Sequence, residues 1–166
     1  MSWQEVCDDP KSRNLPFKIE LNDQGQILMT PVKVYRSLFQ GRIAGLLYSN
    51  LTDGDVLVEC AIATKKGTKV ADVAWASRGR LQVIRNEIEC SIAPEICIEI
   101  MSSANTKKEM TQKIKLYLAN GATEVWICSE EGAIEFFTKT GKSNHSLLAP
   151  SFPARLHNAR QSGSSR

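Results

Sequence analysis

The sequence predicts an α/β (α+β) fold in which helices flank a mixed central β-sheet. Three observations support this class: two pairs of strand-like segments joined by turn residues, a strand–helix–strand unit over residues 95–128, and a last strand pair around a glycine turn. The chain has 166 residues, enough for one domain with a core but short for two. We therefore expect a single domain over residues 1–153 and a disordered tail over residues 154–166.

The first thirty residues predict a short helix followed by a β-hairpin. Ser2 and Glu5 have the spacing of a capping box, and Pro10 would end the helix that they begin. Residues 15–21 alternate as a strand does, and after the turn sequence NDQG at residues 22–25 the chain returns as a second strand. One face of the first strand would carry Phe17, Ile19 and Leu21, and the other face Lys18 and Glu20.

A longer helix and a second antiparallel strand pair are expected next. Apolar residues recur at helical spacing after the hairpin and predict a helix that ends near Asn50. Residues 55–63 and 70–76 read as antiparallel strands that turn at Gly67. Residues 77–88 indicate either a helix or an irregular connection.

The strand–helix–strand unit is the part of the pattern that requires a parallel strand pair. Residues 95–101 and 123–128 are the two strands, and a capping box from Thr106 to Glu109 begins the helix between them, which ends at an Asn-Gly pair. Such a crossover makes the two strands parallel and the connection right-handed. Residues 133–138 then form the partner of the second strand.

Composition narrows the chemistry to carboxylates and lysines. The chain has two histidines and neither a GxxxxGK[ST] nor a GxGxxG motif, which argues against Ser–His–Asp or Cys–His catalysis and against a histidine-rich metal site. Five cysteines without a CxxC pair indicate reduced thiols and a cytoplasmic location. No apolar run is long enough to span a bilayer, and no signal peptide is expected. The arginines of residues 154–166 carry the whole net charge of +3, so DNA binding would need a local patch.

Three neighbouring strands each carry an acid in mid-strand, namely Glu59, Asp72 and Glu99. Because side chains alternate, Glu99 lies on the face opposite the three isoleucines of residues 96–100. Glu59 and Asp72 have alanines two positions away on their own faces, which leaves room for an ion or a substrate. Buried carboxylates need a cation or several donors, and oxygen ligands without His or Cys suit Mg²⁺ or Mn²⁺. The alternative is that these acids lie at solvated strand ends.

The helix that follows carries a lysine beside its apolar stripe. Lys113 is three residues after Met110 and four before Tyr117, so its amine could reach over the sheet towards Glu99. The other lysines of the helix should lie on its solvated face: Lys107, Lys108 and Lys115. The alternative for Lys113 is an amine that extends into solvent along an apolar surface.

Several segments in this order carry a family resemblance: LPFKIELNDQGQILMTP, QGRIAGLL, ECAIATKKGTKVADVAWAS, APEICIEIMSSAN and KIKLYLANGATEVWIC. They resemble the PD-(D/E)XK nucleases and, more closely, the Uma-two family of restriction-endonuclease-like proteins. The resemblance runs from Trp3 to about Pro153 and implies a restriction-endonuclease-like fold.

By this resemblance, Asp72 stands at the PD aspartate, where Ala71 replaces the proline, and Glu99 stands at the (D/E)XK acid. Met101 occupies the place of the expected lysine, and Lys113 of KIKLY matches the position that carries the lysine in this family. Relatives also tend to have acids at the positions of Glu20 and Glu59. They often have histidine near the position of Arg36, so the role of that position is open.

The resemblance implies a metal-dependent endonuclease that hydrolyses DNA. Asp72, Glu99 and the carbonyl of Ile100 would hold Mg²⁺ or Mn²⁺. Lys113 would orient the attacking water or stabilise charge in the transition state, and Glu59 could bind a second metal or position a water. Nucleases of this fold often act as dimers, so a homodimer is expected. Two alternatives stay open: an inactive nuclease-like fold that binds DNA or protein, and a structural protein whose acids only keep the sheet soluble.

Overall fold

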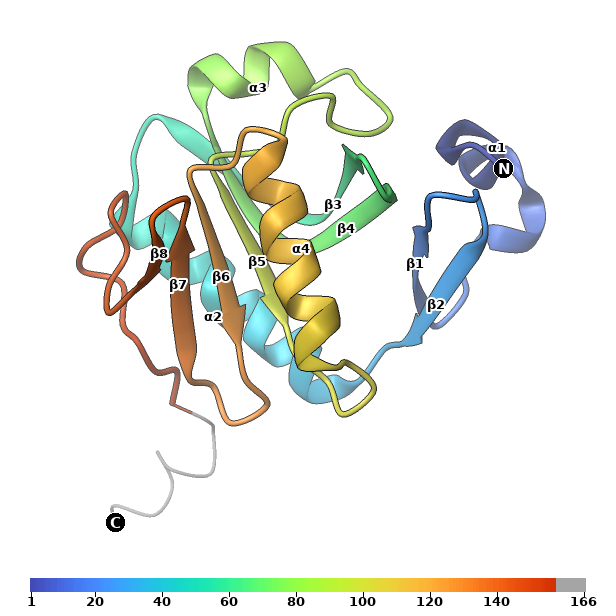
Figure 1. Cartoon of the computed structure of the whole chain (residues 1–166). Helices are drawn as coiled ribbons and strands as arrows, with labels where there is room; N and C mark the ends of the chain where they lie inside the picture. The colour runs from blue at the N-terminus through green and yellow to red at the C-terminus, as the bar shows by residue number, and fades with distance from the viewer. Residues whose placement is uncertain (158–166) are drawn as a thin grey trace.

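A six-stranded mixed β-sheet forms the centre of the structure, a computed structural model that describes residues 1–157 of the chain (Figure 1). Its strands lie in the order β3–β4–β5–β6–β7–β8. Their bounds are Gly54–Thr64 (β3), Gly67–Ser77 (β4), Ile96–Ile100 (β5), Glu124–Cys128 (β6), Ile134–Thr138 (β7) and Gly141–Ser143 (β8). Strands β5 and β6 are parallel, and the other neighbouring pairs are antiparallel. The predicted fold class and the predicted parallel pairing of the two crossover strands are thus confirmed.

Helices cover both faces of this sheet. Figure 1 shows α4 in front of the sheet and α2 behind it. The helices are α1 (Trp3–Asp8), a 3₁₀ turn η1 (Pro10–Ser12), α2 (Val34–Asn50), α3 (Arg78–Ile84) and α4 (Lys107–Ala119). Both predicted capping boxes are present, at Ser2 for α1 and at Thr106 for α4. Within residues 1–157, no helix is long and apolar enough to cross a membrane.

Two apolar cores lie on opposite faces of the sheet, as alternation along β5 predicts. The isoleucines of β5 pack with Phe39, Ile43 and Leu47 of α2 and with Trp126 of β6. On the other face, Cys97 of β5 packs with Tyr117 and Leu118 of α4. The side of β5 that carries Glu99 is therefore the side that α4 covers.

The β1–β2 hairpin is a separate two-stranded sheet beside the larger one (Figure 1). Strands β1 (Phe17–Leu21) and β2 (Ile27–Pro31) pair antiparallel. The hairpin's turn rests on the β3–β4 turn, where Gly67 has φ +88° and a Cβ atom would collide with the backbone oxygens of Leu21 and Asn22. This close backbone approach requires glycine and fixes one end of the hairpin near the start of β4.

The last described residues pack against β7 and the core. Ala133 and Arg155 form an isolated antiparallel bridge, and Leu156 is buried in the α2-side core. The ordered packing therefore reaches beyond Pro153, where we expected the domain to end. The remaining tail, residues 158–166, lies outside the described residues. Strand β8 was not predicted, because its three residues are too few to give a periodic pattern.

Candidate active site

The register of β4 and β5 brings Asp72 and Glu99 together. Val73 pairs with Ile98 and Ala74 with Cys97, so Asp72 and Glu99 follow at the next position of an antiparallel pair, on the face that α4 covers. Oδ2 of Asp72 accepts a hydrogen bond of 2.7 Å from the backbone N–H of Ile100. This bond ties the end of β5 to β4 through a side chain. Asp72 is fully buried, and Glu99 is 1% exposed.

Lys18, from β1, places its ammonium group between these two carboxylates. Its Nζ lies 2.8 Å from Oε2 of Glu99 and 3.2 Å from Oδ1 of Asp72. A third carboxylate oxygen, Oε1 of Glu20, lies 3.8 Å from the same Nζ. Lys18 and Glu20 are each 7% exposed. The polar face of β1 is therefore its buried face towards the large sheet.

Lys113 and Tyr117 approach Glu99 from α4, one helical turn apart. Lys113 Nζ donates to Oε1 of Glu20 at 2.8 Å and to Oε1 of Glu99 at 3.2 Å. The hydroxyl of Tyr117 donates to the same Oε1 of Glu99 at 2.7 Å. Glu20 is fixed in turn by the backbone N–H of Val70, at 2.7 Å. Three carboxylates, those of Glu20, Glu99 and Asp72, and the two ammonium groups of Lys18 and Lys113 thus form one buried network.

Arg36, near the start of α2, is the third cation of the site and lies beside Asp72. Its Nε lies 3.7 Å from Oδ1 of Asp72, and the side chain of Gln40, one turn later, donates to the backbone oxygen of Asp72 at 3.1 Å. Arg36 is 3% exposed. Its Nε and Nη2 have no hydrogen-bond partner among the described residues.

Burial and charge pairing act in opposite directions on the protonation of the network. Burial alone would raise the pKa of Glu99, but Lys113, Lys18 and the Tyr117 hydroxyl outweigh it and hold that pKa at about 2. Burial alone would lower the pKa of Lys18, but the carboxylates of Glu99 and Asp72 raise it well above its ordinary value. Burial raises the pKa of Asp72, and Lys18 only partly offsets this. Glu99 is therefore an anion and Lys18 a cation at neutral pH.

Glu59 does not join the network. It is exposed, and its backbone has φ +54°, a left-handed conformation that is rare for a residue other than glycine. It lines a pocket of about 250 Å³ together with Lys18, Arg13 and Val70. Glu59 thus shares a pocket with Lys18 and does not contact Asp72 or Glu99.

The donor set fits a divalent cation at the position shared by Asp72 and Glu99. One ammonium group contacts both carboxylates, so the two side chains converge on a single cation position. Their oxygens are the ligands that Mg²⁺ and Mn²⁺ favour. Within residues 1–157 no group of three or more His, Cys, Asp or Glu side chains is placed to hold a metal ion. Backbone or water oxygens would therefore have to complete the coordination shell.

The chain belongs to the Uma2 (Uma-two) family, whose model, described as "Putative restriction endonuclease", matches residues 3–157. The chain is also similar in fold to a solved structure from Anabaena variabilis, titled as a putative nuclease belonging to DUF820. The TM-score is 0.67 and the identity 19%, and the similarity covers 86% of this chain and 83% of that one. No curated protein matches the chain.

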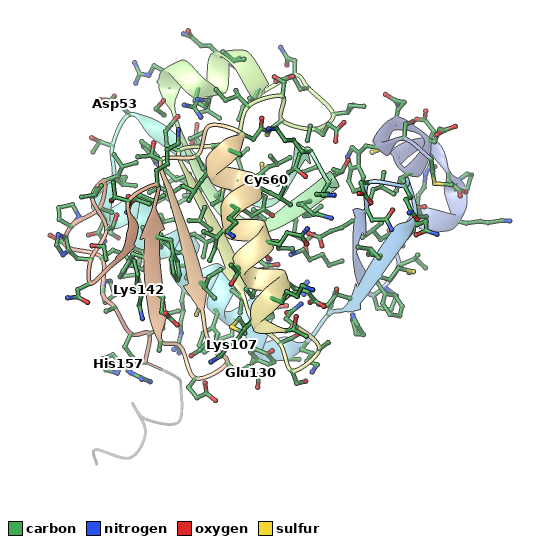
Figure 2. The ribbon with its side chains drawn as sticks, viewed as in Figure 1. Asp53, Cys60, Lys107, Glu130, Lys142 and His157 are labelled. Carbon is green, nitrogen blue, oxygen red and sulfur yellow. The ribbon has the colours of Figure 1, made fainter. Side chains whose placement is uncertain are left out.

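The structure brings together three of the four predicted catalytic residues, Asp72, Glu99 and Lys113, and leaves Glu59 apart. Ile100, predicted as a metal ligand through its carbonyl, contacts Asp72 through its backbone N–H. The three lysines assigned to the solvated side of α4, Lys107, Lys108 and Lys115, are exposed. Figure 2 shows Lys107 at the start of α4, away from the middle of the sheet. Lys18 and the hydroxyl of Tyr117 are additional members that sequence reasoning missed. The signal that could have indicated Lys18 was charge balance. Three buried acids, Glu20, Asp72 and Glu99, need more cations than Lys113 alone.

Proposed function

We propose that the protein is a metal-dependent endonuclease that hydrolyses phosphodiester bonds of DNA. The convergence of Asp72 and Glu99 on one cation position, with Lys113 beside it, is the observation that carries this proposal. Membership of a family described as "Putative restriction endonuclease" supports it. The fold likeness to a protein titled as a putative nuclease is consistent with it.

Asp72 and Glu99 would hold Mg²⁺ or Mn²⁺, together with the carbonyl oxygen of Ile100. When bound, such an ion polarises the scissile phosphate and lowers the pKa of the attacking water. The N–H of Ile100 orients Asp72 by donating to Oδ2, which leaves Oδ1 directed at the shared cation position. Tyr117 holds Glu99 in the same way through Oε1, so each acid has one oxygen fixed and the other directed at the cation position, where Lys18 lies in the structure.

Lys113 would orient the attacking water or stabilise negative charge on the phosphate. Its side chain is 12% exposed, and its amine lies between Glu20 and Glu99, next to one of the two acids that would hold the ion. Glu20 anchors this amine, because the N–H of Val70 fixes the Glu20 carboxylate. Glu59 would bind a second metal ion or position a water in the pocket that it lines together with Lys18.

Arg36 would contact the phosphate of the substrate. A buried guanidinium with unpartnered donors is costly, and Nε and Nη2 of Arg36 have no protein acceptor among residues 1–157. Oδ1 of Asp72 already accepts from Lys18 at 3.2 Å, whereas Arg36 stays 3.7 Å away. The planar, multiply donating guanidinium suits phosphate oxygens.

The second candidate is an inactive nuclease-like fold that binds DNA or protein. The near-complete burial and internal neutralisation of the carboxylates favour it, because an active site must admit an ion and a phosphate. A homodimer and a cytoplasmic location stay part of the proposal. Exposed apolar side chains on the hairpin would suit an interface between copies: Phe17, Ile27, Leu28 and Met29, 36–46% exposed.

Incubation with supercoiled plasmid and with single-stranded DNA, in Mg²⁺, Mn²⁺ or EDTA, tests the proposal. We expect metal-dependent cutting by the wild type and by the control Lys115→Met, whose exposed lysine lies on the same helix as Lys113. We expect none from Asp72→Asn. Cutting that Asp72→Asn retains would refute the assignment of the site, and DNA binding without cutting in any metal would support the inactive module.

A further inference from the structure

The cation position shared by Asp72 and Glu99 already has an occupant that belongs to the protein. Lys18 Nζ lies within hydrogen-bond distance of both carboxylates and 3.8 Å from Glu20. A divalent ion bound by the same two oxygens needs contacts of roughly 2.0–2.1 Å. The ion and the ammonium group would then compete for the same space and repel each other at short range.

The two acids are also inaccessible to an ion from solvent in this arrangement. Asp72 and Glu99 are at most 1% exposed, and Lys18 is 7% exposed, so the acids are closed off from solvent in the structure. Lys18 also lines the pocket of about 250 Å³ that Glu59 lines. Withdrawal of Lys18 would connect that pocket to the two carboxylates.

The element that carries Lys18 can swing about the end that the Gly67 contact holds without breaking the large sheet. The β1–β2 hairpin has its own two-stranded ladder. Side chains join it to β4 and α4: Glu20 accepts from Val70 N–H and Lys113, and Lys69 donates to the Leu21 carbonyl at 3.0 Å. An exposed ion pair of 3.1 Å between Asp23 and Lys66 adds one more link. Hairpin displacement would exchange these contacts for water and leave the β3–β8 ladder intact.

We propose that Lys18 is an internal competitor of the divalent metal ion and that metal binding displaces it together with the β1–β2 hairpin. This inference rests on the proposed function, because it takes Asp72 and Glu99 as the metal ligands. Lys18 is then a positioning residue: its amine keeps the two acids preorganised and neutralised until an ion arrives. The displaced amine is left at the mouth of the site, next to Glu59, where a phosphate can meet it.

Calorimetric titration of Mg²⁺ and Mn²⁺ into wild type, Lys18→Met and the matched control Lys66→Met tests the competition. Lys66→Met removes a hairpin link without touching the buried acids. We expect Lys18→Met to bind the ion about tenfold more tightly than wild type or more, since a competing unit charge is gone. Lys66→Met should stay within a few-fold of the wild type, because the exposed ion pair that it removes contributes about 1 kcal/mol or less to holding the hairpin. Equal or weaker binding by Lys18→Met, beside measurable binding by the wild type, overturns the competition and leaves the metal site standing.

Hydrogen–deuterium exchange on the wild type keeps the inference testable where Lys18→Met fails to fold. Saturating Mn²⁺ should speed amide exchange in residues 17–31 and leave residues 34–50 of α2 unchanged. Unchanged or slower exchange in the hairpin would contradict the displacement. Absence of ion binding by both wild type and Lys18→Met would overturn the inference and the metal requirement of the proposed function together, whereas binding without DNA cleavage would remove only the nuclease activity.

Discussion

Removal of a single hydroxyl, by Tyr117→Phe, should measure how strongly the network holds Glu99. The ring of Tyr117 is fully buried in the core on the α4 side, so phenylalanine keeps the packing. The lost contact is a 2.7 Å hydrogen bond to a charged, buried carboxylate. Hydrogen bonds to charged groups contribute about 1.5–3 kcal/mol, so unfolding free energy should fall by about 2 kcal/mol. For a chain of this size that is roughly 4–8 °C in Tm.

Urea unfolding at pH 7, followed by circular dichroism with EDTA present, is the suitable assay for Tyr117→Phe. Tyr48→Phe is the matched control, because Tyr48 is 57% exposed and its hydroxyl should matter little. The loss in Tyr117→Phe should shrink as Glu99 becomes protonated near pH 2, because the bond is then made to a neutral group. A Tyr117→Phe variant as stable as the wild type at pH 7 would show that Tyr117 does not hold Glu99.

Three further outcomes follow from the same network. The pKa of Glu99 is lowered from 4.5 to about 2. Its contribution to the free energy of unfolding, about 3 kcal/mol, is therefore present above pH 4.5 and lost as the pH falls to 2. The raised pKa of Asp72 acts in the opposite sense. Acid unfolding of wild type against Glu99→Gln measures this, and equal pH profiles would contradict it. Lys113→Met should lower the free energy of unfolding by about 3 kcal/mol, because it leaves the buried carboxylates of Glu20 and Glu99 short of a cation. The control Lys115→Met should lower it by almost nothing. Equal losses of the two variants in thermal unfolding would refute the distinction. Glu59→Gly should stabilise the protein by about 1 kcal/mol or less, because glycine accepts φ +54° without strain; a loss in urea unfolding would instead indicate that the Glu59 side chain makes a stabilising contact.

Alternation along β5 was sufficient to predict which of its residues face α2 and which face α4. It placed Glu99 opposite the isoleucines of β5, and the register of β4 and β5 then places Asp72 next to it. Helical spacing predicted Lys113 correctly, because its amine does reach Glu99 from the edge of the apolar stripe. These residues were predictable because each depends on local periodicity and on one crossover connection.

Contacts between separate elements were not predictable in this way. The alternation of β1 separates Lys18 and Glu20 from the apolar residues but does not show which face is covered, and the structure buries the charged one. Lys18 meets Glu99 across a separation of 81 residues, which no periodicity encodes. The position of Glu59 was misjudged for a related reason: parity assumes extended backbone, and the left-handed φ of Glu59 interrupts the alternation.

The most direct test of the account is the rate of Mg²⁺-dependent plasmid cleavage by wild type, Glu99→Gln and Glu135→Gln, each at a concentration where all three proteins are folded. Glu135 is the control acid, since it forms an exposed ion pair with Lys142. We expect cleavage by wild type and Glu135→Gln, abolished by EDTA, and a loss of at least about a hundredfold in Glu99→Gln. Cleavage at the wild-type rate by Glu99→Gln would contradict the central claim that the buried carboxylates of β4 and β5 form the catalytic metal site.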